Sequence, residues 1–108
     1  MSITDGDRGT FRIRVDSGGS HVHVDADGRF GLDGWTILED ALRPLVESGA
    51  LSITINMESV TDIEPAVVAA LARTRSANLR VSCENPSEAA AARLRANGAA
   101  LLLGISPN

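Results

Sequence analysis

The sequence has 108 residues, a length that predicts one domain. Its formal net charge of -4, with only two phenylalanines and one tryptophan, argues against nucleic-acid binding, which needs a basic surface and aromatic rings for base stacking. Every basic residue is an arginine and tyrosine is absent, which excludes lysine Schiff-base chemistry, a P-loop lysine and a tyrosine acid.

Three further features predict a cytoplasmic protein without a membrane segment. No apolar run approaches the roughly 18 residues of a membrane helix. The first ten residues lack the basic and apolar regions of a signal peptide. Cys83 is the single cysteine, so an internal disulfide is impossible.

The first predicted structure is an antiparallel hairpin. Residues 1–9 are polar and are expected to be mobile, so the domain is expected to span 10–108. Apolar residues alternate with polar ones over 11–15 and again over 22–26, the period of a half-buried strand. The glycine-containing segment 16–20 between them predicts a turn.

A helix is predicted next. Residues 28–31 end the hairpin, and Asp33 is expected to cap a helix that runs to about Glu47, with an apolar stripe at i, i+3, i+4 spacing. Pro44 lies inside this pattern and would cost about 3 kcal/mol in a straight helix, so we expect a kink or a late start.

The central stretch, 51–78, predicts a strand, a loop and a helix. Residues 51–57 alternate, and residues 58–65 form the predicted loop. Pro65 suits the first helical position, where a backbone N–H would have no intrahelical partner. Glu64 then lies beside the positive end of the helix dipole.

The last elements are a strand over 79–83 and a helix whose start, Asn85-Pro86-Ser87-Glu88, predicts Asn85 as the cap. This helix is expected to end at Asn97-Gly98. Residues 99–105 are apolar and predict an edge strand or a last helical turn.

These elements predict an α/β fold with the order β-β-α-β-α-β-α. Alternation in all four strands favours helices mainly on one face of a mixed four- to five-stranded sheet, with a more polar opposite face.

The segment 56–63 resembles a strand and loop of the STAS domain, the family of bacterial anti-sigma factor antagonists, whose usual sequence is Asp-Leu-Ser-Gly-Val-x-x-Ile. The family continues with Asp-Ser-Ser-Gly-Leu and is phosphorylated just after the Asp. By position Glu64 matches that Asp, Pro65 the phosphoacceptor and Ala66 the next residue. Neither Pro65 nor Ala66 has a hydroxyl, so the switch residue is missing.

The resemblance implies a non-catalytic regulatory domain that binds an anti-sigma factor with serine-kinase activity, and a homodimer is left open. The implied contact surface is the loop and helix start 58–68, for which we name Glu58, Ser59, Thr61, Asp62, Glu64, Pro65, Ala66 and Val68.

Several alternatives stay open. One alternative is that the loop 58–66 is an ordinary connection. Another is that Ser59 or Thr61 accepts the phosphate. A third alternative is a structural subunit of a larger complex that uses the polar sheet face as its interface. A fourth is a module that binds a nucleotide or anion at the N-terminus of the second helix, although the charge of Glu64 would repel an anion there. An enzyme is disfavoured because no nucleophile, base and acid form a set.

Metal and cofactor sites are not expected. His21 and His23 share a strand face, with Asp25 beside them, but an exposed polar face is the better interpretation. The segment 25–28 resembles the start of a calcium loop without its terminal acid, which favours a turn. Cys83 is expected in the core.

Overall fold

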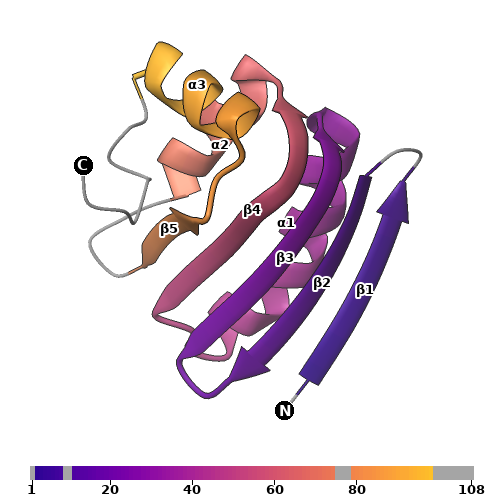
Figure 1. The fold of residues 1–108 in the computed structure, drawn as a ribbon. Helices are drawn as coiled ribbons and strands as arrows, with labels where there is room; N and C mark the ends of the chain where they lie inside the picture. Colours follow the sequence, from indigo (N-terminus) through magenta and orange to yellow (C-terminus); the bar gives the residue numbers. More distant parts are fainter. Residues whose placement is uncertain (1, 9–10, 75–78, 99–108) are drawn as a thin grey trace.

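The structure is a computed structural model that describes residues 2–8, 11–74 and 79–98. Its elements are β1 (Ser2–Arg8), β2 (Phe11–Gly18), β3 (His21–Phe30), α1 (Leu32–Glu47), β4 (Ser52–Ile63), α2 (Pro65–Thr74), β5 (Arg80–Glu84) and α3 (Glu88–Ala96). The five strands form one sheet in the order β1-β2-β3-β4-β5 (Figure 1). The first three strands are antiparallel neighbours, whereas β4 is parallel to both β3 and β5. The predicted mixed α/β sheet is confirmed.

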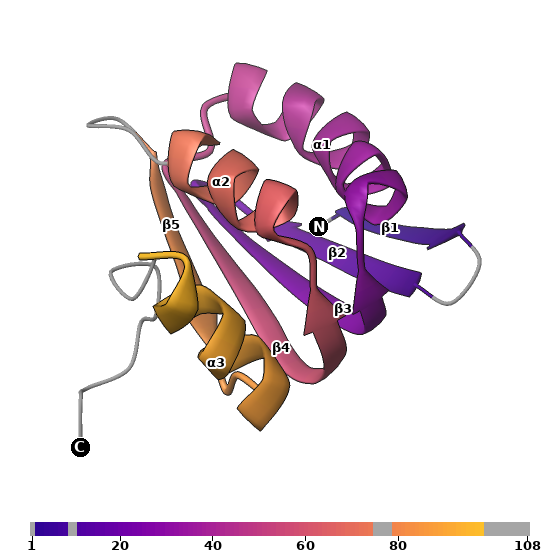
Figure 2. The same ribbon diagram turned by 90° about the horizontal axis from the view of Figure 1, so that it is seen from above.

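The helices lie together against one face of the sheet, as Figure 2 shows. Most alternate residues of β2, β3, β5 and the first half of β4 are buried beneath them, for example Phe11, Ile13 and Val15 in β2. The opposite face carries polar residues such as Arg14 and Asp25, which are exposed. This arrangement confirms the one-sided helical layer that the alternation predicts.

The N-terminal segment differs from the expectation of a mobile end over residues 1–9. Ser2–Arg8 is paired antiparallel to β2, in register from Ser2 opposite Ser17 to Arg8 opposite Phe11. A polar segment without alternation carries no strand signal, yet the free edge of β2 can bind any backbone, because ladder hydrogen bonds use main-chain groups. The element order therefore has one strand more than predicted.

The predicted turn over 25–28 is wrong because these residues lie within β3, and the expected end of the hairpin over 28–31 and the predicted loop over 58–65 are also largely strand. β3 continues to Phe30 and β4 continues to Ile63, and the two extensions pair with each other. The register shows why the sequence pattern hides this: Asp25 is opposite Asn56 but Asp27 is opposite Ser59, so β4 carries one extra residue there. It carries a second where Gly28 is opposite Val60 but Arg29 is opposite Asp62. Such a bulge breaks the alternation on which strand prediction depends.

α2 begins at Pro65 as predicted, whereas the starts of α1 and α3 differ from prediction. α1 begins at Leu32 with Gly31 at its N-cap, so Asp33 lies inside the first turn and the start is not late. Pro44 is within the last turn of the helix. The cap of α3 is Ser87, whose Oγ accepts a hydrogen bond from the Ala90 N–H at 3.1 Å, and not Asn85. The predicted end at Asn97-Gly98 is confirmed. The expectation for residues 99–105 lies outside the described residues.

α1 packs closely on β2 at Gly34. Gly34 is buried there, and a Cβ placed on it would lie 2.5 Å from Cδ2 of Phe11. The Phe11 ring is itself stacked on Phe30, with the ring centroids 4.6 Å apart. Because both rings are fully buried, Phe11 has little room to move away from an added side chain.

We therefore expect Gly34→Ala to lower the free energy of unfolding, by roughly 1–3 kcal/mol, which is typical of overpacking. Without a clash, replacing glycine by alanine within a helix would raise the free energy of unfolding by about 1 kcal/mol. The sign of the measured change therefore distinguishes overpacking from helix propensity. The measurement is urea unfolding, with Thr36→Ala on the exposed side of α1 as the control, expected within about 0.5 kcal/mol of the wild type. A Gly34→Ala protein as stable as the wild type would contradict the close packing.

Candidate functional site

The residues expected to bind a partner lie where β4 passes into α2. Glu64 alone separates the last residue of β4 from the first residue of α2. We use the name docking patch for Glu58, Ser59, Thr61, Asp62, Glu64, Pro65 and Ala66. The patch is thus the end of a paired strand and the start of a helix, and its backbone is set by both.

Most of the patch is accessible from outside. Glu58, Ser59, Thr61, Pro65 and Ala66 are exposed, and Asp62 and Glu64 are half-buried. Val68, also predicted as a contact, is only 1% exposed and packs in the core. The reason is helical spacing, because Val67, Val68 and Leu71 form the buried side of α2. Val68 therefore supports the patch from beneath and does not belong to its surface.

Glu64 joins three elements. Its N–H donates a hydrogen bond to the Phe30 carbonyl at 3.0 Å, and its own carbonyl accepts from Val67 N at 2.9 Å in the first turn of α2. Its carboxylate lies over Gly31, where an added Cβ would be 2.6 Å from Oε1. The carboxylate is therefore close to the N-termini of both α1 and α2, whose dipoles favour a negative charge.

Asp62 is held by α3. Its Oδ1 accepts a hydrogen bond from Arg93 Nε at 3.0 Å, and this bond holds the pKa of the Asp62 carboxyl below its ordinary value of 3.8. Arg29 contributes a smaller effect in the same direction. The pair is partly exposed, with 36% of the Asp62 side chain and 47% of the Arg93 side chain accessible. Its chief consequence is positional, because exposed ion pairs contribute little stability.

Ser87 fastens the start of α3 to the bulged part of β4. Its N–H donates to the Met57 carbonyl at 3.1 Å, and its hydroxyl donates to the Val60 carbonyl while accepting from Ala90 N. The bulge has its own support, since Asn56 Oδ1 accepts a hydrogen bond from the Glu58 N–H at 3.0 Å. The pairing of β4 with β5 ends at Asn56. Beyond that residue, Ser87 provides hydrogen bonds to carbonyls of β4 that a neighbouring strand would otherwise bind.

Sequence reasoning missed Leu32, which follows Gly31 and is 50% exposed. It lies next to the residue that Glu64 covers, so an apolar side chain borders the docking patch. The sequence did contain a signal that Leu32 is exposed. Leu32 falls outside the apolar stripe of α1, and the residue one turn farther along on its side of the helix is the polar Thr36.

The other predicted sites are separate from the patch. On the polar sheet face, His21 Nδ1 is 2.6 Å from Ser52 Oγ, and His23 is 3.4 Å from Asp25 and 3.8 Å from Glu84. Among the described residues, no three His, Cys, Asp or Glu side chains are grouped so as to hold a metal ion. Cys83 is buried as expected, and its burial raises the pKa of the thiol to about 12.

Within the described ranges, no helix combines the length and apolar character needed to cross a membrane.

Comparisons with known proteins place the fold. The sequence matches no family model and no curated protein. Two solved structures are similar in fold. The anti-sigma factor antagonist SpoIIAA in its unphosphorylated form has a TM-score of 0.72 at 14% identity, with 89% of each chain covered. An anti-sigma factor antagonist from Mycobacterium paratuberculosis has a TM-score of 0.67 at 15% identity, covering 99% of this chain and 87% of the other.

The chain is therefore an α/β domain of STAS-like fold, as its sequence predicts. More particularly, its fold is the one found in anti-sigma factor antagonists.

The Asp62–Arg93 pair makes stability depend on pH in a defined direction. The folded pKa of Asp62 is lowered, so the pair stabilises the protein above the unfolded pKa, and this stabilisation is lost as pH falls through the folded value. We expect Asp62→Asn to be less stable than the wild type at pH 7, with the difference shrinking below about pH 4. Urea unfolding across this range measures it, and Arg93→Gln should behave alike. A difference that stays constant down to pH 3 would exclude this role for the pair.

Proposed function

We propose that this protein is a non-catalytic regulator of the anti-sigma factor antagonist type, which binds an anti-sigma factor through the docking patch and Leu32. The observation that carries the proposal is an exposed, rigidly held surface at the β4–α2 junction of a STAS-like fold. An apolar Leu32 beside polar and acidic groups also suits a protein interface, which has an apolar centre and a polar rim.

The fixed backbone of the patch supports this proposal further. Glu64 is bound to β3 and α2, Asp62 to α3, and the bulge to Ser87. A surface already held in one conformation loses little entropy when a partner binds, which favours affinity. The same patch would serve a structural subunit, so binding has to be tested with a partner of the stated class.

Regulation in this proposal does not use the family's phosphoacceptor position. Pro65 is exposed at the first position of α2 but has no hydroxyl, and Glu64 supplies a permanent negative charge beside it. Control of binding then comes from the amount of partner or from Ser59 or Thr61, whose hydroxyls are on exposed residues of β4.

We expect Ala66→Arg to weaken binding of the anti-sigma factor at least tenfold, because a bulky cation in the first turn of α2 would obstruct the interface. The partner is recovered by pull-down from the source bacterium, and affinity is measured by calorimetry. Ala72→Arg makes the same change at an exposed site near the other end of α2 and should keep wild-type affinity. Equal loss in both variants, or in neither, would remove the docking patch from the interface.

Restoring a hydroxyl should restore the modification. Incubated with the partner kinase and ATP, Pro65→Ser is expected to gain one phosphate and the wild type none, as read by intact mass. Pro65→Ala is the control for loss of the proline ring. A wild-type protein that gains phosphate, mapped to Ser59 or Thr61 by peptide analysis, would show that the switch has moved and was not lost.

A further inference from the structure

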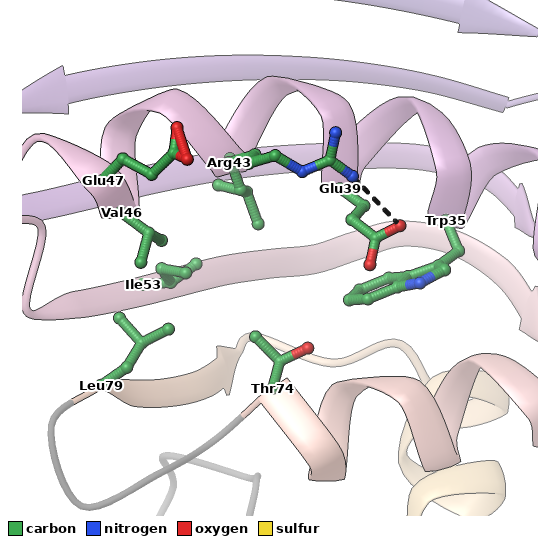
Figure 3. Close-up of a pocket in the computed structure, with 9 residues that line it drawn as sticks. Trp35, Glu39, Arg43, Val46, Glu47, Ile53, Thr74 and Leu79 are labelled. Carbon is green, nitrogen blue, oxygen red and sulfur yellow. Dashed lines mark ion pairs between the residues drawn. The ribbon is translucent and has the colours of Figure 1, made fainter.

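A second concave surface lies between α1 and α2, at the opposite end of α2 from the docking patch. Its apolar part has a volume of about 240 Å³ and is lined by Trp35, Leu42, Val46, Ile53 and Leu79, with Thr74 and the charged residues Glu39, Arg43 and Glu47 at its rim. In Figure 3, Val46, Ile53 and Leu79 point into the same gap, and the Trp35 ring lies across from Thr74. We call this surface, with its polar extension, the interhelical groove.

The groove continues into a polar part of about 150 Å³. Trp35, Glu39 and Thr74 belong to both parts, and Ala70 and Arg73 complete the polar end. A ligand that spans the two would therefore have an apolar body and a polar head. The combined space is near the lower limit of small-molecule pockets, which hold about 300–1,000 Å³. This size suits one slender chain.

Charge along the rim decides which head group fits. Glu39 lines both parts of the groove and is paired with Arg43 at 3.9 Å, and Arg43 is also 3.7 Å from Asp40. The side chain of Arg73, at the polar end, makes no hydrogen bond or ion pair within the described part of the chain. Glu47, at the apolar end, is likewise without a partner there. An anionic head is thus attracted to the Arg73 end and repelled from the Glu47 end.

We propose that the interhelical groove binds a free single-chain amphiphile with a carboxylate head. The chain lies against Trp35 and Val46, over the buried side chains of Leu42, Ile53 and Leu79, and the carboxylate accepts hydrogen bonds from the Arg73 guanidinium. Val46, a large apolar residue 37% exposed at the groove wall, loses its contact with water when the chain binds.

The protein carries its own reporter for this site. Trp35 is the single tryptophan and there is no tyrosine, so intrinsic fluorescence comes from a residue of the groove. The full chain is titrated with decanoate, decanol and decylamine below their micelle concentrations. We expect a saturable change with decanoate, binding roughly fivefold or more tighter than decanol, and weaker binding still for decylamine, as for a hydrogen bond to a charged group.

Three variants assign the contacts. Arg73→Gln should lower the affinity for decanoate to that for decanol, and should leave the affinity for decanol unchanged. Val46→Asp should weaken both. Arg80→Gln removes an exposed arginine from the opposite face of the sheet and should change neither.

Several results would overturn the proposal. These are no saturable change with any amphiphile, decylamine binding as tightly as decanoate, or an Arg73→Gln protein with unchanged preference. A dimer seen by sedimentation, which Val46→Asp breaks and decanoate does not, would show that a second copy fills the groove instead. The proposal is independent of anti-sigma factor binding, because the groove and the docking patch lie at opposite ends of α2.

Discussion

The pairing of β4 with β3 beyond the bulge is the constraint on which the docking patch depends. After the register shift at Met57 and Glu58 and a second one at Thr61, the pairing of the two strands continues until Phe30 is opposite Ile63. At that point Glu64 N–H binds the Phe30 carbonyl, and α2 begins one residue later. The direction of α2, and therefore the exposure of Pro65 and Ala66, follows from where this parallel ladder ends. A surface of this kind is set by main-chain hydrogen bonds and then varied through its exposed side chains.

On the far side of β4, pairing with β5 ends at Asn56, and within the described residues α3 occupies the place beyond it. Ser87, at the N-cap of α3, binds the Met57 and Val60 carbonyls. Arg93, farther along α3, binds the Asp62 carboxylate. Without these contacts, buried carbonyls of β4 would lack partners, which is costly in a protein interior. α3 thus supports the docking patch from the side, and its exposed Arg93 lies beside Asp62 at the edge of the patch.

The two ends of α2 have different surfaces. Its N-terminus lies beside Glu64, Leu32 and the exposed end of β4, a polar area with one apolar neighbour. Its C-terminus borders the apolar interhelical groove at Thr74 and Arg73. A short helix that contributes to both surfaces is a simple physical connection between them. The groove exists because α1 and α2 meet the sheet side by side and their facing side chains leave a gap over Ile53.

Local pattern in the chain was sufficient for the strands at 11–15, 22–26, 51–57 and 79–83, for the helix start at Pro65 and for the one-sided core, because each depends on periodicity or on a residue's own backbone preference. The residues named from the sequence as a contact surface do lie together at the β4–α2 junction, except that Val68 is buried, and their role in binding stays a prediction. Only the tertiary structure decided the pairing of Ser2–Arg8, the bulge, the strand extension to Ile63 and the Asp62–Arg93 contact. These features join residues far apart in the chain through backbone groups that every residue possesses, so no spacing along the sequence records them.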